Sequence, residues 1–94
     1  MNSVSSNAAY VNRIASYIFN ISNDQNPVAA SYVNLAGILK NQLGYSEEQE
    51  RSVFAVIALE GRITYEGSMR LAIDIAAGNL VCLRNVCKTQ CAEL

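Results

Sequence analysis

Three glycines at equal intervals constrain the fold of this chain more than any other feature. Gly44, Gly61 and Gly78 are 17 residues apart, and each closely follows a run of apolar residues at helical spacing. Glycine is favoured just after a helix because the backbone can turn left-handed there without steric penalty. The spacing therefore predicts three helices that end at these glycines.

Apolar residues recur at steps of three and four along the rest of the chain as well, which is typical of amphipathic helices. The pattern predicts five short helices, at residues 6–20, 27–43, 46–60, 64–77 and 79–91. No stretch shows the alternation that indicates a strand. The short connections predict that consecutive helices are antiparallel neighbours.

Two of these helices have clear start signals. Asn26 is suited to cap the second helix, and Pro27 fits its first position, where the missing N–H has no cost. The third helix follows the letters SEEQ, Ser46 to Gln49, in which serine and glutamine can cap each other's backbone N–H groups.

We therefore expect an all-α fold, a compact single-domain bundle that includes the whole chain, residues 1–94. The run VFAVIAL, Val53–Leu59, is apolar on every side. A helix without a polar face belongs in the middle of a bundle. The helix at 46–60 is accordingly predicted to be the central one, although the same letters would also suit a buried strand.

The composition predicts contact with another protein. Apolar residues make up 51% of the chain and charged residues only 16%, against about 25% charged in an average domain. A domain of 94 residues has difficulty covering so much apolar surface, and exposed apolar patches mark interaction sites. We expect a non-catalytic protein–protein interaction module, an adaptor, chaperone-like protein or inhibitor, that also forms a homodimer.

Enzymatic chemistry is not indicated. The chain has no histidine, which removes the commonest general base and the commonest zinc ligand. Neither of the common glycine-rich phosphate-binding motifs occurs. The expectation is a protein that is not an enzyme and has no cofactor.

The three cysteines are best interpreted as packing residues. Cys82, Cys87 and Cys91 are spaced C-x4-C-x3-C, which differs from zinc-binding pairs, and no metal is expected. Cys87 shares an apolar stripe with Leu80 and Leu83, so we predict that it is buried, whereas Cys91 is expected to be more exposed.

The same cysteines bear on location. An odd number of cysteines, with no signal-like N-terminal segment, is typical of free thiols in the reducing cytoplasm. No apolar run approaches the roughly 18 residues of a membrane span. We expect a cytoplasmic protein that does not bind a membrane.

A helix-turn-helix DNA-binding regulator is the alternative, with residues 53–75 as the motif. The second helix would present Thr64, Tyr65, Ser68 and Arg70 to DNA. Against it, the net charge is −1, whereas nucleic-acid binding requires a basic surface. Nucleic acid is therefore an unlikely partner.

The predicted partner-binding residues are tyrosines and acids. Tyr10 and Tyr17 share one edge of the first helix, and tyrosines are common at interfaces. Each tyrosine could equally pack at the core boundary with a solvated hydroxyl. The acids at the start of the third helix could dock on a basic surface, or they could only stabilise the helix through its dipole. The full set is Tyr10, Arg13, Tyr17, Tyr45, Glu47, Glu48, Glu50 and Tyr65.

Overall fold

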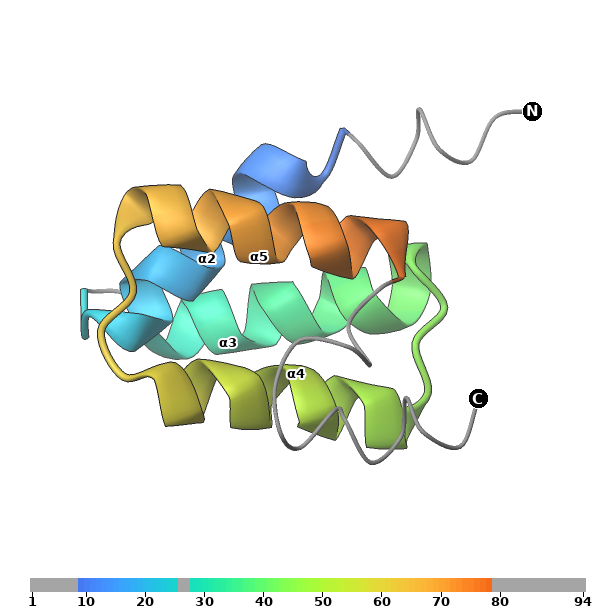
Figure 1. Ribbon diagram of the computed structural model, residues 1–94. Coiled ribbons are helices and arrows are strands. Elements are labelled where there is room, and N and C mark those ends of the chain that lie inside the picture. The colour runs from blue at the N-terminus through green and yellow to red at the C-terminus, as the bar shows by residue number, and fades with distance from the viewer. Residues whose placement is uncertain (1–8, 26–27, 79–94) are drawn as a thin grey trace.

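The computed structural model describes residues 9–25 and 28–78 of the chain. Their elements are α2 (Val11–Ser22), α3 (Val28–Gly37), the π-helical turn η1 (Ile38–Gln42), α4 (Glu47–Glu60) and α5 (Tyr65–Ala77) (Figure 1). These ranges contain no strand, so the all-α prediction is confirmed for the described part of the chain. The predicted helix at 79–91, with all three cysteines, lies outside the described residues.

The three glycines that were predicted to end helices have backbone φ angles in the left-handed region. Gly44, Gly61 and Gly78 all have positive φ, at 72°, 73° and 80°, a region that L side chains rarely adopt. Ser46 forms the predicted capping box: its hydroxyl accepts from the Gln49 N–H at 3.1 Å, and its own N–H donates to Gln49 Oε1 at 2.8 Å.

The second helix differs from the prediction in its last turns. It was expected to be regular over 27–43, but it widens after Gly37 into η1, where the Leu43 N–H donates to the Ile38 carbonyl at 3.0 Å. A π turn holds one residue more than an α turn. The neighbours Ile38 and Leu39 are both buried there, which a single regular stripe does not predict.

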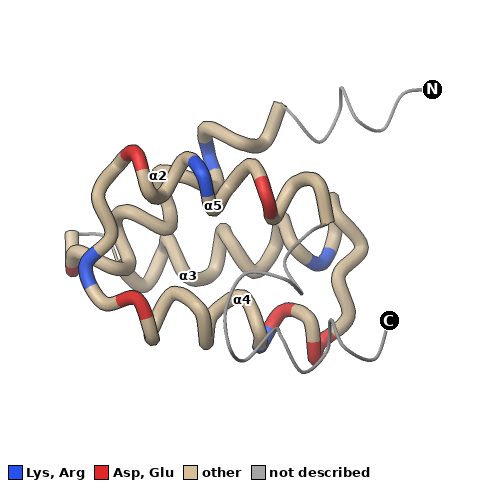
Figure 2. The backbone as a smooth tube through the Cα atoms, viewed as in Figure 1, with Lys and Arg blue, Asp and Glu red and all other residues tan. Residues whose placement is uncertain are grey.

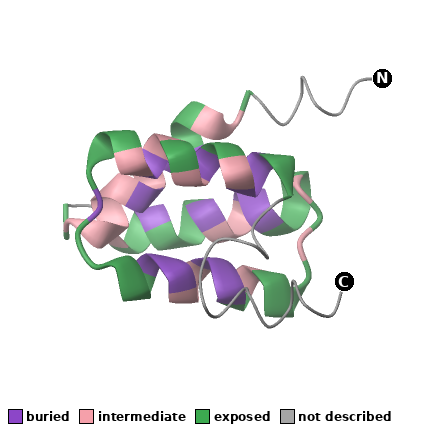
Figure 3. Cartoon of the chain, viewed as in Figure 1, coloured by how far each residue is buried: buried purple, intermediate pink, exposed green. Residues whose placement is uncertain are grey.

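The central helix is α2, and the prediction that helix 46–60 is central is wrong. α2 packs against α5, α3 and α4, and its interface with α5 is the largest. α4 buries only one face, and Leu59 at its end is 62% exposed (Figure 3). The apolar run Val53–Leu59 did not predict the position of the helix correctly, because it also contains the small residues Ala55 and Ala58, which can face solvent at little cost.

The core lies where α2, α4, α5 and the continuous helix made of α3 and η1 meet; we call these the four helical rods of the described chain. Its fully buried side chains come from every rod; the largest are Ile14, Ile18, Leu35, Leu39, Val53, Val56 and Ile75. At one end, Asn23 fastens α2 to the segment before α5. Its amide donates to the Phe19 carbonyl at 3.0 Å and to the Ile63 carbonyl at 2.8 Å.

Candidate interaction surface

A hollow between α2 and α3 contains three of the predicted partner-binding residues. Tyr10, Arg13 and Tyr17 follow one another at steps of three and four, so they occupy one face along α2. They line a hollow of about 430 Å³, which we call the α2–α3 hollow. Its opposite wall comes from α3 and η1: Val33, Asn34, Gly37, Ile38, Asn41 and Gln42.

Specific contacts hold the α2 wall of this hollow in place. The Tyr10 hydroxyl donates to Gln42 Oε1 at 2.8 Å and so bridges the two walls. The Arg13 guanidinium lies 5.9 Å from the centre of the Tyr10 ring, within the range of a cation–π interaction. An aromatic wall that is already ordered loses little conformational entropy when a partner binds.

The opposite wall combines polar amides with an exposed valine and a glycine. Val33 is 69% exposed, the highest value among the large apolar residues of the described chain. Gly37 has helical dihedral angles, φ −61° and ψ −43°, and a Cβ placed on it would meet no atom within 4 Å. No other helix of the described chain packs closely against Gly37, and the space beside it is open.

The surroundings of the hollow carry little charge. α3 has no charged residue, and Arg13 is the only one in α2. The other charges of residues 9–25 and 28–78 lie on η1, α4, α5 and the connecting loops (Figure 2). The cores of protein interfaces are depleted in charged residues and enriched in aromatic residues and arginine. The hollow matches that composition, and it offers no cluster of cations for phosphates.

Tyr45 lies apart from the hollow and serves the fold. Its hydroxyl donates to the carbonyl of Ile75 in α5, and its N–H donates to the Leu39 carbonyl at 2.8 Å. Burial raises the pKa of Tyr45 from 10 to about 12. The structure thus places Tyr45 outside the α2–α3 hollow, partly buried and with its hydroxyl bonded within the fold.

The three acids at the start of α4 do not form one surface. Glu47 and Glu48 are exposed, whereas the Glu50 side chain is only 14% exposed and lies 4.0 Å from the Lys40 ammonium. The other Glu50 carboxylate oxygen is buried without a hydrogen-bond partner among the described residues. Glu50 thus faces inward toward η1, and only Glu47 and Glu48 could meet a basic partner.

Tyr65 is also separate from the hollow. It is 48% exposed, and its ring meets the edge of the Phe19 ring at 5.8 Å. Both side chains lie at the end of α2 where Asn23 holds the loop before α5. Tyr65 could contribute to an interface, but not to the same one as Tyr10 and Tyr17 through the α2–α3 hollow.

The polar residues of the helix-turn-helix alternative differ in how accessible they are. The Thr64 hydroxyl caps α5 by accepting from the Gly67 N–H at 3.0 Å. Ser68 is completely buried. Arg70 lies 3.7 Å from Glu66 on its own helix. Ser68 is therefore closed to DNA and the Thr64 hydroxyl is engaged as a cap, whereas the Arg70 side chain is 76% exposed.

The sequence prediction missed the α3 wall of the hollow. Tyr32 on the same helix lies outside the hollow: it is 46% exposed, and its ring centre is 5.5 Å from that of Phe54 in α4. Val33 could have indicated this wall from sequence, because it is a large apolar residue on the exposed side of a helix that has no charged residue.

No family model, curated protein or solved structure matches the chain. None of the helices in the described ranges is long and apolar enough to cross a bilayer.

Proposed function

We propose that the protein is a non-catalytic protein-binding module and that its α2–α3 hollow receives part of a partner protein. The single observation that carries this proposal is the convergence of Tyr10, Arg13 and Tyr17 with the exposed Val33 around one hollow of about 430 Å³. Tyrosine and arginine side chains are enriched in interface hot spots.

The expected occupant is an apolar side chain of the partner, flanked by hydrogen-bonding groups. Val33 and Ile38 supply apolar contact, while Asn34 and Asn41 on the same wall offer amide donors and acceptors. The protein would act by covering a surface of its partner, as an adaptor, a chaperone-like protein or an inhibitor does. The cytoplasm is the proposed location, on the grounds of the odd number of cysteines.

A photo-crosslinking amino acid at Asn34 tests the proposal in cells that naturally make the protein. We expect a discrete covalent adduct with another protein, and we expect Val33→Glu to remove it, because a carboxylate at the rim would have to be desolvated on binding. The matched control is Ile73→Glu, since Ile73 on α5 is also half-exposed, at 53%. Adducts that survive Val33→Glu, or that Ile73→Glu removes equally, would contradict the proposal.

A second copy of the chain is the companion candidate as a partner. Exposed apolar residues occur on α3, α4 and α5: Tyr32, Val33, Leu59, Tyr65 and Ile73. A symmetric dimer is the simplest arrangement that covers such surface.

A further inference from the structure

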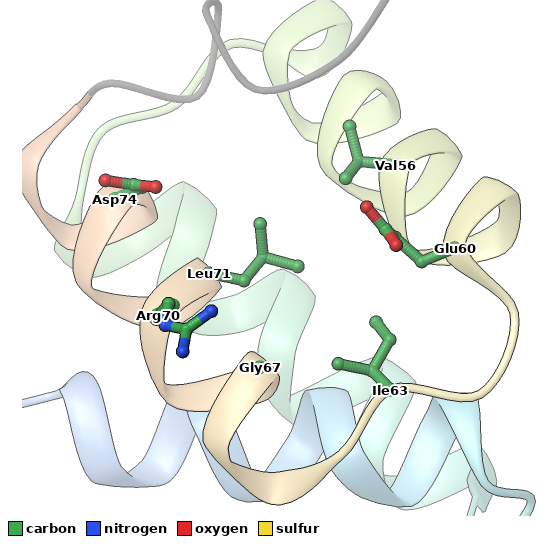
Figure 4. A pocket seen from close by; sticks show the side chains of 7 residues that line it. All are labelled: Val56, Glu60, Ile63, Gly67, Arg70, Leu71 and Asp74. Carbon is green, nitrogen blue, oxygen red and sulfur yellow. The ribbon is translucent and has the colours of Figure 1, made fainter.

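A second recess, between α4 and α5, is distinct from the α2–α3 hollow. Its volume is about 350 Å³, and its walls are Val56, Glu60, Ile63, Gly67, Arg70, Leu71 and Asp74. Figure 4 shows Val56 and Leu71 facing each other across the gap, with Ile63 at one end. We call this recess the α4–α5 groove.

The groove exists because α4 and α5 are not a major packing pair. Both helices pack against α2, and the space between them on the outer side is left unfilled. Leu71 is only partly buried, and Leu59, which follows Val56 by three residues on α4, is 62% exposed. Within the groove lining, Val56 and Ile63 are buried, and Leu71 is the apolar residue that the described part of the chain leaves only partly covered.

The charges that line the groove are mainly acidic. Glu60 and Asp74 stand against one cation, Arg70, so the lining has a net charge of −1. Arg70 lies 3.7 Å from Glu66, outside the groove lining. An occupant with an apolar stripe and basic flanking residues would be complementary to this surface.

We propose that residues 79–94 of the same chain form an amphipathic helix that lies in the α4–α5 groove. Gly78 ends α5 in the left-handed conformation, with its N–H directed at the carbonyls of Asp74 and Ile75. This type of cap stops the helix and lets the chain change direction. Residue 79 therefore starts one helical turn beyond Asp74, which is itself part of the groove wall.

The length of this segment suits the groove. Sixteen residues, 79 to 94, span roughly 24 Å as a helix at about 1.5 Å per residue. The 13 residues of α5 span roughly 20 Å by the same measure. A helix that returns antiparallel to α5 would bring Cys87 about level with Leu71.

The sequence of the segment is complementary to the groove as well. Leu80, Leu83 and Cys87 follow at steps of three and four and form one apolar stripe. Arg84 and Lys88 flank this stripe, and with Glu93 they give residues 79–94 a net charge of +1 from side chains. Cys82 follows Leu80 by two residues and so points to the opposite side of such a helix.

Thiol labelling of the full chain tests the docking directly. One variant keeps only Cys87 (Cys82→Ser, Cys91→Ser) and the other keeps only Cys82 (Cys87→Ser, Cys91→Ser). Under native conditions we expect a maleimide to modify Cys87 more slowly than Cys82, by about tenfold or more, because only the docked face is protected. In denaturant the two rates should be equal.

Substitutions in the groove then connect this protection to the proposed site. Leu71→Glu should raise the labelling rate of Cys87 to that of Cys82, whereas Val33→Glu in the other hollow should not change it. The Val33 control also separates this inference from the proposed function, which depends on the α2–α3 hollow. Equal labelling of Cys87 and Cys82 in the otherwise unchanged chain would overturn the proposal.

Disulfide trapping provides a second readout that does not depend on a destabilising substitution. With Cys87 as the only native cysteine, Leu71→Cys, which lies level with Cys87 in the antiparallel arrangement, should be oxidised by added copper phenanthroline to a disulfide within one chain, and Asn34→Cys should not. A disulfide that joins two chains, seen as a dimer on a non-reducing gel, would show a second copy in the groove and would also overturn the proposal.

Discussion

Tyr45 connects the loop after η1 to the last turns of α5 through one hydrogen bond. Its hydroxyl donates to the Ile75 carbonyl, and its ring packs against the core. Desolvation raises the pKa of Tyr45 to about 12, because the neutral hydroxyl is favoured where it is partly buried. The native state therefore keeps this proton at a pH where the unfolded chain loses it.

Replacing Tyr45 by phenylalanine should destabilise the fold by about 1–2 kcal/mol, since the Ile75 carbonyl loses a donor. The variant should also change the response to pH. The stability that Tyr45 contributes is complete below about pH 10 and is lost as the pH rises through about 12. Urea unfolding followed by circular dichroism at pH 9 and pH 11 measures both effects.

The comparison between variants is the control in that experiment, because the other tyrosines also lose protons at high pH. The unchanged protein should lose more stability between pH 9 and pH 11 than Tyr45→Phe does. Equal losses in the two proteins would contradict the role assigned to the Tyr45 hydroxyl.

At the residue scale, the sequence could predict which side chains share a helical face but not which polar atoms are used internally. The spacing of Tyr10, Arg13 and Tyr17 was sufficient to place them together on α2. Tyr45, an aromatic residue in a loop, and Glu50, an acid near a helix start, were predicted as contact residues from the same kind of sequence feature. Their inward orientation depends on Ile75 and Lys40, which are distant along the chain.

Two glycines within helices should respond differently to substitution by alanine. Gly37 has no atom near the position of a new Cβ, so Gly37→Ala should stabilise the protein by about 1 kcal/mol. That corresponds to an increase of about 4–8 °C in melting temperature. Gly67→Ala should give no such increase, since its Cβ would lie 3.0 Å from Ile63 Cγ2 and 3.3 Å from Thr64 Oγ1.

Thermal melting of the two variants beside the unchanged protein tests this pair. Both substitutions add the same methyl group to a helix, so the difference reports the space around each glycine. An equal increase in both variants would show that the close approach of Ile63 to Gly67 is not restrictive.

At the element scale, the helix boundaries were the most predictable feature. Caps and stop glycines act within a few residues, and so Ser46, Gly61 and Gly78 could be assigned from local sequence alone. The π turn and the position of α4 in the bundle could not be predicted from local sequence. Both depend on which neighbours share the core, and the pattern of one segment does not contain that information.

At the scale of the molecule, the apolar composition is reflected in exposed side chains. Tyr32, Val33 and Leu59 are each more than 45% exposed. We expect reversible self-association, visible as an increase in mass by light scattering between about 1 and 100 μM protein. Val33→Glu should weaken the association if the α2–α3 hollow is the contact. A constant monomer mass over this range would exclude the dimer.

The position of Asn23 and the large interface between α2 and α5 have a consequence for folding kinetics. The hydrogen bond from Asn23 to Ile63 spans 40 residues, and α2 finds its largest interface with the last helix of the described chain rather than with its neighbour. Loop closure over such separations has an entropic cost, and non-local contacts slow folding. During synthesis, α2 would emerge from the ribosome long before α5, and the apolar face of α2 that packs against α5 would stay exposed until α5 is made.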